Sequence, residues 1–296
     1  MPSSDFRITQ RTLGTEVMAN LQRSLGKLQQ IQEQMSSGKV LNRPSDSPTA
    51  AVSSLAFRSQ LKRSQQYQRN IQDGIGWLGI ADNTLQSMVT SLQRVRTLAV
   101  NGTDGAMSSQ DRSALAEEVD QLRAGLLTLA NSTYQNRPLF GGNTTSATAY
   151  DQNGVYQGDA GGVTRSIAPG VSLDVNVTGG STFGSGATGL FGTLAQLSND
   201  LRTNPGNLGS DLDAIDGHLS NVLSTLGDVG ARYRRLETTN DALSTNVIGL
   251  QQSLSEVEDV DLPQVITQLQ TQQMAYQAAL AATSKVIQPS LVDFLK

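Results

Sequence analysis

The sequence predicts a mainly α-helical protein: a long coiled-coil-like rod with paired N- and C-terminal segments, plus a small β-rich insertion. Three observations carry this prediction. Apolar residues recur in steps of three and four over long stretches at both ends of the chain, which is the spacing of amphipathic helices. From about Pro138 to Gly206 the chain is instead rich in Gly, Ser, Thr and Asn. Aromatic residues make up only 4% of the 296 residues, fewer than one thick globular core would be expected to bury.

The first expected helix carries an apolar stripe and stops at a glycine. The stripe has heptad-like spacing and includes Val17, Leu21, Leu28 and Ile31. Gly38 is a natural helix stop, and Pro44 and Pro48 cannot lie inside one continuous helix. Ser47 and Pro48 suit the N-cap and the first position of a second helix.

The second helix should run from Pro48 to the break NGTDGAMSSQ at 101–110. Its stripe includes Ile71, Ile75, Leu78, Leu85, Val89 and Leu92. Gly74, Gly76 and Gly79 weaken the pattern locally, because glycine inside a helix costs up to about 1 kcal/mol relative to alanine. A third helix follows, with one face formed by Leu115, Val119, Leu122, Leu126 and Leu129.

The central segment is expected to form a small sheet. VSLDVNV (171–177) alternates apolar and polar residues with a period of two, which indicates a half-buried strand. VYQG and VTRSI lie on either side of the Gly-rich DAGG and suit the two strands of a hairpin.

The clearest helical pattern lies between Leu212 and Val257, where Asn240 alone interrupts the apolar steps. One polar residue in such a seam fixes register at some cost in stability, so Asn240 is the predicted register residue. A last helix begins near Leu262, and Pro289 should kink or end it. Its stripe includes Ile266, Leu269, Tyr276, Leu280, Ile287, Leu291 and Phe294.

The two terminal stripes predict an assembly interface. An amphipathic helix alone is only marginally stable until its apolar face is covered. The N-terminal stripe can pair with the C-terminal stripe, but a two-helix hairpin still leaves apolar surface open. We therefore expect further copies of the chain, or another partner, to cover the residues of both stripes.

The sequence points to neither an enzyme nor a cofactor or metal site. There is no Cys, and the single His, His218, falls on the side of its helix expected to face solvent. The acidic runs EEVD (117–120) and SEVEDVD (255–261) are expected to be solvated surface.

The composition also gives no sign of nucleic-acid binding, because the net charge is −4 and basic and acidic residues are interspersed. No apolar run approaches the ~20 residues that a membrane span needs. The polar start MPSSDFRITQ lacks a signal-peptide core, which by itself predicts a cytoplasmic chain but leaves signal-independent export open.

Five segments, in chain order, resemble the flagellin superfamily. They are SSGKVLNRPSDSP (36–48), LQRVRTLAVNGTDG (92–105), NSTYQNRPLFGG (131–142), DVGARYRRLE (228–237) and EVEDVDLPQVITQLQTQQMAYQAAL (256–280). The turn NRPSDSP and the tail KVIQPSLVDFL resemble the hook–filament junction branch of the superfamily more than the filament flagellins. Ser47 departs from that branch, which usually has Asp there. Filament flagellin stays the alternative.

The resemblance implies an architecture of three domains. They are an inner pair of terminal helices (1–42 and 258–296), a surrounding helical rod (43–138 and 207–257) and a small β-rich outer domain (139–206). It also implies that Gly38, Pro44 and Pro48 form a hinge-like linker between an inner helix and a rod helix.

The resemblance further implies a structural role in the bacterial flagellum, as an adaptor between hook and filament. The implied partners are other copies of the chain, a neighbouring hook-associated protein, flagellin and an export chaperone. Such a chain would be in the cytoplasm only until it is exported unfolded through the flagellar type III pathway. It would then be extracellular, and its terminal helices would order on assembly.

Overall fold

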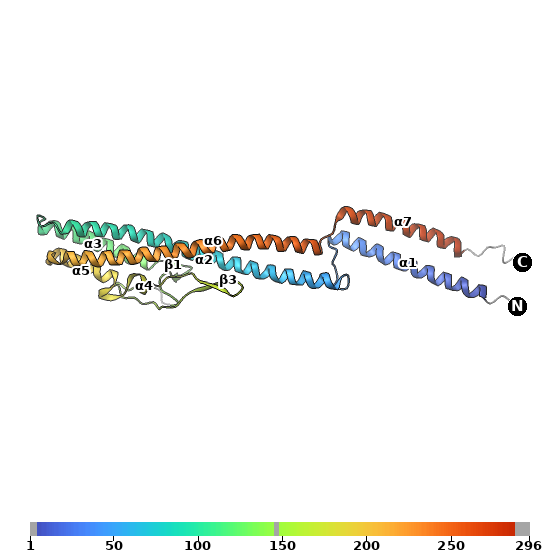
Figure 1. Ribbon diagram of the computed structural model, residues 1–296, viewed down its shortest axis with the longest axis horizontal. Coiled ribbons are helices and arrows are strands. Elements are labelled where there is room, and N and C mark those ends of the chain that lie inside the picture. Colours follow the sequence, from blue (N-terminus) through green and yellow to red (C-terminus); the bar gives the residue numbers. More distant parts are fainter. Residues whose placement is uncertain (1–4, 145–147, 288–296) are drawn as a thin grey trace. The chain divides into compact units, whose positions relative to one another are not determined.

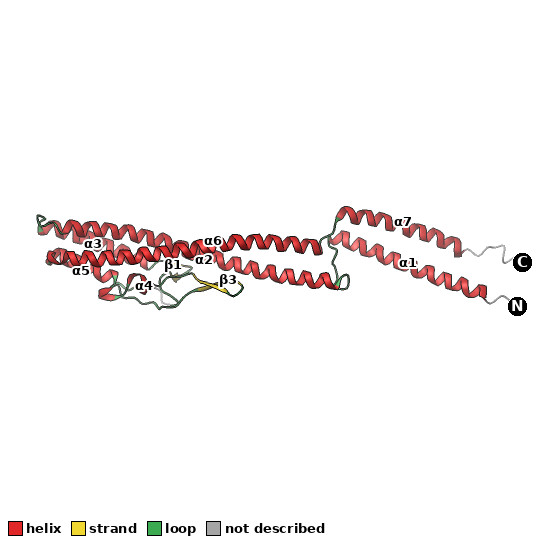
Figure 2. Ribbon diagram, viewed as in Figure 1, coloured by secondary structure: helices red, strands yellow, loops and turns green. Residues whose placement is uncertain are grey.

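The computed structural model describes residues 5–144 and 148–287, and most of them are helical (Figures 1 and 2). The helices are α1 (Asp5–Ser37), α2 (Pro48–Gly102), α3 (Ser109–Ala130), α4 (Gly179–Phe183), α5 (Leu190–Thr203), α6 (Leu208–Glu258) and α7 (Leu262–Ile287), with short 3₁₀ turns at Gly186–Thr188 and Pro205–Asn207. The strands are β1 (Thr133–Tyr134), β2 (Arg137–Pro138), β3 (Thr164–Ala168) and β4 (Val171–Asp174). The predicted fold class, long helices with a small β-rich insertion, is confirmed.

The chain divides into two compact units. The terminal unit contains the residues up to Lys62 and those from Ile248 onward, and the central unit is Arg63–Val247. The division falls within α2 and α6 rather than at the Pro-rich linker, and 139–206 belongs to the central unit together with most of the two long helices. The three-domain division implied by the resemblance stays a prediction.

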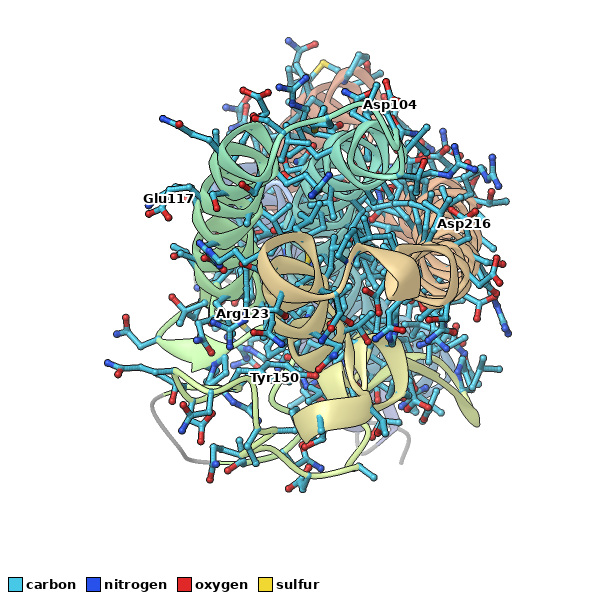
Figure 3. All side chains as sticks on the ribbon, turned by 90° about the vertical axis from the view of Figure 1, so that its left-hand side faces the viewer. Asp104, Glu117, Arg123, Tyr150 and Asp216 are labelled. Carbon is cyan, nitrogen blue, oxygen red and sulfur yellow. The ribbon has the colours of Figure 1, made fainter. Side chains whose placement is uncertain are left out.

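The core of the central unit lies between its helices and extends into the segment 139–183. The predicted stripes supply it, because α2 buries Ile71, Leu78, Leu85 and Leu92, α3 buries Val119 and Leu126, and α6 buries Ile215, Val222, Val229 and Leu236. At the end of this unit, Glu117 of α3 and Asp216 of α6 point outward on opposite sides (Figure 3). The heptad-like spacing therefore marks the inward faces correctly.

Two of the three glycines that weakened the α2 pattern, Gly74 and Gly76, are places of close packing. A Cβ atom on Gly74 would lie 2.9 Å from both Leu236 Cδ1 and Val175 Cγ1, and one on Gly76 would lie 2.7 Å from the Tyr134 hydroxyl. The helix continues through both positions, and the missing side chains let α6 and the β segments approach it.

The predicted pairing of the hairpin is wrong. The strand in VTRSI, β3, pairs with β4 across Pro169 and Gly170, with Arg165 opposite Leu173. VYQG contributes only an isolated bridge between Tyr150 and Tyr156. The physical reason is the connection: Gly170 adopts φ +71°, which turns the chain tightly between two adjacent segments of alternating pattern.

The segment expected to be β-rich also contains α5, which the sequence prediction missed. Its signal was present, since Leu190, Leu194, Leu197 and Leu201 follow steps of four and three, and all four are buried. The surrounding Gly and Ser residues hid that pattern. Helix α5 packs against α3 within the central unit (Figure 1).

Candidate assembly surface and linker clamp

Helices α1 and α7 pack side by side in the terminal unit (Figure 1). They run antiparallel, because Ser24 meets Gln272 while the C-terminal end of α1 lies beside the connection that precedes α7. Their facing side chains form a seam with heptad-like spacing, consisting of Val17, Leu21, Ser24, Leu28 and Ile31 of α1 and Val265, Leu269, Gln272, Tyr276 and Ala279 of α7. Most of these are only half-buried, so the helix pair does not bury its own apolar surface completely.

One polar contact lies inside this seam. Gln272 Nε2 donates to Ser24 Oγ at 2.8 Å and to the Ser24 carbonyl oxygen at 3.2 Å. A hydrogen-bonded polar pair among apolar positions favours one register over neighbouring ones. Nothing in the sequence pattern marks this pair, because Ser24 and Gln272 are ordinary in a chain so rich in Ser and Gln.

A second apolar strip flanks the seam and is exposed. Met18, Leu25, Ile266 and Leu280 each directly follow a seam position, and they are between 39% and 56% exposed. In an antiparallel pair of right-handed helices, the positions that directly follow the seam lie on the same side of the pair. We call these four residues the apolar flank.

The predicted interface residues therefore fall into two groups. Val17, Leu21, Leu28, Ile31, Leu269 and Tyr276 belong to the seam, whereas Ile266 and Leu280 belong to the flank. Ile287 is the last residue of α7. Leu291 and Phe294, like the helix breaker Pro289, lie outside the described residues.

The linker between α1 and α2 is tied to the α6–α7 connection. Gly38 ends α1 with φ +70°, and its N–H donates to the Gln34 carbonyl at 2.9 Å. The Gly38 carbonyl accepts from the Val260 N–H at 3.0 Å, and the Val40 N–H donates to the Glu258 carbonyl at 2.7 Å. Two backbone hydrogen bonds thus join segments more than 200 residues apart in the chain.

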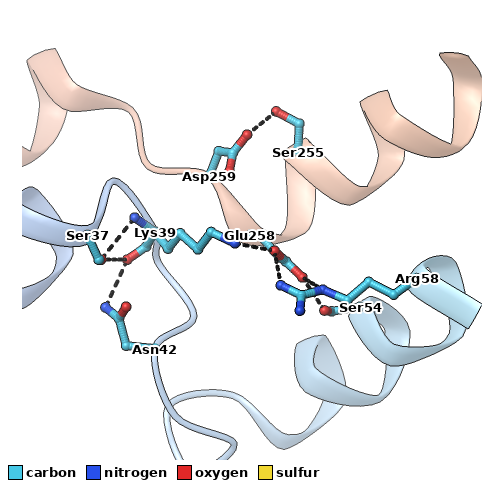
Figure 4. A network of polar contacts seen from close by, with 8 residues as sticks. All are labelled: Ser37, Lys39, Asn42, Ser54, Arg58, Ser255, Glu258 and Asp259. Atoms are coloured by element: carbon cyan, nitrogen blue, oxygen red, sulfur yellow. Dashed lines mark hydrogen bonds and ion pairs between the residues drawn. The ribbon is translucent and has the colours of Figure 1, made fainter. Parts of the chain in front are cut away.

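The side chain of Glu258 completes this tie (Figure 4). Lys39 Nζ donates to Glu258 Oε2 at 2.9 Å, and Arg58 donates from Nη2 to Oε2 at 2.6 Å and from Nε to Oε1 at 2.7 Å. The Ser54 hydroxyl donates to Oε1 as well. Glu258 itself is 3% exposed. The hydrogen bonds from Arg58 first, then those from Ser54 and Lys39, lower the pKa of Glu258 from 4.5 to about 2 although burial opposes this.

We call Glu258 with Lys39, Ser54 and Arg58 the linker clamp. The expectation that SEVEDVD is solvated surface is wrong for Glu258, although Glu256, Asp259 and Asp261 are exposed. The pattern gave no sign of this, because the cations that bury Glu258 lie some 200 residues earlier in the chain.

The rest of the linker is held by local capping. Asp46 Oδ2 accepts from the backbone N–H groups of Asn42 and Arg43 at 3.1 and 2.7 Å. Ser47 Oγ accepts from the Ala50 N–H at 3.3 Å, and Pro48 is the first residue of α2, as expected. Gly38, Pro44 and Pro48 therefore lie in an ordered turn, and their role as a hinge stays a prediction.

Two expectations concern polar residues of α6 in the central unit. Asn240 Oδ1 accepts from Gln72 Nε2 at 3.3 Å, and its role in fixing register stays a prediction. The prediction that His218 faces solvent is wrong. It is half-buried, its Nε2 lies 3.1 Å from Thr193 Oγ1, and burial lowers its pKa. Helix α5, absent from the predicted elements, covers it.

Two kinds of feature, a cluster of metal ligands and a membrane-spanning helix, are absent from the described part of the chain. Across residues 5–144 and 148–287, no three His, Cys, Asp or Glu side chains gather as a metal ion would require. No helix among them is both long and apolar enough to cross a bilayer.

The comparisons with known proteins define the class. The family model for the bacterial flagellin N-terminal helical region matches residues 8–145, and that for the C-terminal helical region matches residues 212–295. The chain therefore belongs to the flagellin family, and it is a structural protein rather than an enzyme.

Within the flagellin family, the chain is similar to hook-associated proteins and to flagellins. The chain is 26% identical to flagellar hook-associated protein 3 of Escherichia coli, over 98% of this chain and 100% of that one. It is 26% identical to the protein of the same name from Salmonella typhimurium, over 93% and 95%. A flagellin of Halalkalibacterium halodurans is 28% identical over 91% of both chains.

Solved structures give the same fold. Bacillus cereus FlgL superposes with a TM-score of 0.61 at 25% identity, and the match covers 68% of this chain and 99% of that one. A putative flagellar hook-associated protein of Vibrio parahaemolyticus gives a TM-score of 0.66 at 24% identity, covering 72% and 100%. The latter supports the fold alone.

Proposed function

We propose that the chain is a structural adaptor at the junction between the flagellar hook and the filament. The observation that carries this is its similarity, over nearly the full length of both chains, to two proteins named flagellar hook-associated protein 3. The structural similarity to Bacillus cereus FlgL supports it. The neighbours would be another hook-associated protein on one side and flagellin on the other.

Assembly would proceed through the terminal unit. The half-buried seam of α1 and α7 closes the pair, and the apolar flank supplies the surface that copies of the chain cover. An exposed strip of this kind on a monomer is typical of an interaction surface. Before export an export chaperone would cover the same strip in the cytoplasm, and the assembled protein would be extracellular, at the hook–filament junction.

The location tests the proposal directly. Immunogold electron microscopy on purified native flagella should place the label in a narrow band where hook meets filament. Label along the whole filament would identify a filament flagellin, which the similarity to a Halalkalibacterium flagellin keeps as the second candidate. No label on flagella would reject both.

The apolar flank can be tested with one substitution and a matched control. Leu280→Asp places a charge on the flank, whereas Gln268→Asp places the same charge at an exposed position on the other side of the seam. We expect Leu280→Asp to prevent incorporation into flagella, because a buried unpaired carboxylate is costly. Gln268→Asp should incorporate normally. Equal incorporation of the two variants would contradict the assignment of the flank.

A further inference from the structure

Two carboxyl groups are buried where α5 passes into α6, in the central unit. Asp200, in the last turn of α5, is 1% exposed, and Asp211, in the first turn of α6, is 7% exposed. Each has one buried oxygen, Asp200 Oδ1 and Asp211 Oδ2, without a hydrogen-bond partner. A buried carboxylate oxygen left unpaired is costly, so these two oxygens require an explanation.

The other oxygen of Asp200 is well supplied with donors. Gln196 Nε2 donates to Asp200 Oδ2 at 2.8 Å, and Asn207 Nδ2 donates to the same atom at 3.5 Å. Both of these hydrogen bonds reach Oδ2, so Asp200 Oδ1 is left as an unused acceptor.

No basic side chain in the described residues forms an ion pair with either carboxyl group. Arg202 of α5 is bound to Asp120 and Glu117 of α3, at 2.9 and 3.0 Å. Arg112 of α3 donates to the carbonyl oxygen of Met107 at 2.6 Å. The negative charge of the pair is therefore not neutralised by a neighbouring cation.

The other titratable groups around the two carboxyl groups are further aspartates and one histidine that faces elsewhere. Asp213 of α6 is exposed, and Asp104, in the turn after α2, accepts from the Ala106 N–H at 3.0 Å. His218, about two turns further along α6, faces Thr193 of α5. The pH response of His218 has the opposite sign to that expected of the carboxyl pair, because burial lowers its pKa.

We propose that Asp211 and Asp200 share one proton, with the Asp211 O–H donating to Asp200 Oδ1, and that this pair is a pH-sensitive latch on the α5–α6 corner. Two buried carboxylates in contact cannot both ionise without strong repulsion. Loss of the shared proton puts two like charges into a site without a cation, and the corner loosens.

Loosening of the α5–α6 corner would also affect the end of α2. Leu201 and Leu208, beside the two acids in sequence, pack against the end of α2, where a Cβ atom on Gly102 would lie 2.4 Å from Leu201 Cδ2 and 3.4 Å from Leu208 Cδ1. An opened corner would therefore also release the contact with the last turn of α2.

The titration range follows from the site. Burial, and then the charge of Asp200 and the hydrogen bond to it, raise the pKa of Asp211 from 3.8 to about 6. The helix dipole at the start of α6 acts in the opposite direction. Because the pKa is raised in the folded state, the stabilisation is complete below pH 3.8 and is lost as the pH rises through about 6.

The first test detects the shared proton by titrating the aspartate carboxyl groups of the unmodified full-length chain. Aspartate labelled with ¹³C at the carboxyl carbon should show one buried carboxyl group that titrates near pH 6, well above ordinary aspartates. If every aspartate titrated below about pH 5, the shared proton would be excluded.

The second test uses Asp211→Asn, which keeps a donor toward Asp200 and cannot ionise, with Asp213→Asn as the exposed control. Between pH 4 and pH 6.5 the unfolding equilibrium constant of the wild type should rise, relative to Asp211→Asn, by roughly fiftyfold. Asp213→Asn should follow the wild type. Parallel curves for the wild type and Asp211→Asn would overturn the proposal.

The third test distinguishes a proton from a cation. Millimolar Ca²⁺ or Mg²⁺ should leave the wild-type pH dependence unchanged. If either ion stabilised the wild type at pH 7 and not Asp211→Asn, the pair would be a cation site and the latch proposal would be wrong. Hydrogen exchange of residues 197–212, corrected for the intrinsic rate, should accelerate between pH 4 and pH 6.5 only in chains with Asp211.

Discussion

Replacing Glu258 by Gln should release the linker from the α6–α7 connection. The change removes the charge that Lys39 and Arg58 share but keeps the size of the side chain. The NH2 group of the glutamine side chain would face groups that are themselves donors. At least one of the hydrogen bonds to Arg58 or Ser54 would therefore be lost.

The magnitude follows from the pKa of Glu258. Its lowering from 4.5 to about 2 corresponds, at about 1.4 kcal/mol per unit, to roughly 3 kcal/mol of preference for the charged form. The side chains of Lys39 and Arg58 are 41% and 50% exposed, so water and salt screen part of this. We therefore expect Glu258→Gln to cost about 2 kcal/mol of local stability, a factor of about thirty in the opening equilibrium.

Hydrogen–deuterium exchange of the full-length chain measures this locally. The Val40 and Val260 amides, which make the two backbone bonds between the segments, should exchange about thirtyfold faster in Glu258→Gln than in the wild type. Glu256→Gln, an exposed site in the same turn of α6, is the matched control. Equal protection of both amides in the two variants would refute the clamp.

The pH dependence provides a second check. Because the folded-state pKa of Glu258 is lowered, its stabilisation is present above pH 4.5 and is lost as the pH falls toward about 2. The difference between wild type and Glu258→Gln should therefore disappear in acid. A difference that persisted unchanged at pH 2 would have to come from packing rather than charge.

Two further predictions concern packing in each unit. Gly74→Ala should destabilise the central unit by about 1–2 kcal/mol in urea unfolding, because the new methyl group would crowd Leu236 and Val175. Gly125→Ala, on an exposed face of α3 with nothing within 4 Å of the new Cβ, should instead stabilise by up to about 1 kcal/mol. A loss of stability in both would mean that α2 and α3 are equally crowded. Gln272→Leu should keep α1 and α7 paired but permit neighbouring registers, because it removes the polar contact in the seam. Disulfide cross-linking between cysteines introduced across the seam should then give several products, whereas a single product would show that the contact does not set the register.

Much of the fold was predictable because helix faces follow local periodicity. The stripes of α2, α3 and α6 turned inward as predicted, since burying apolar side chains at three- and four-residue spacing needs no knowledge of the partner. The pairing of β3 was not predictable in the same way, because two segments with alternating pattern could each pair with it. The φ of Gly170 and the neighbouring position of β4 decided it.

The sequence by itself determined the helix stripes, the linker punctuated by Gly38 and Pro48, and the membership of the flagellin family. Only the tertiary structure separated Leu269 in the seam from Leu280 on the exposed flank, because both fit the same helical spacing. It alone also identified Glu258 and the Asp200–Asp211 pair. Their burial depends on side chains from other elements, and local periodicity contains no information about which distant residues cover a charge.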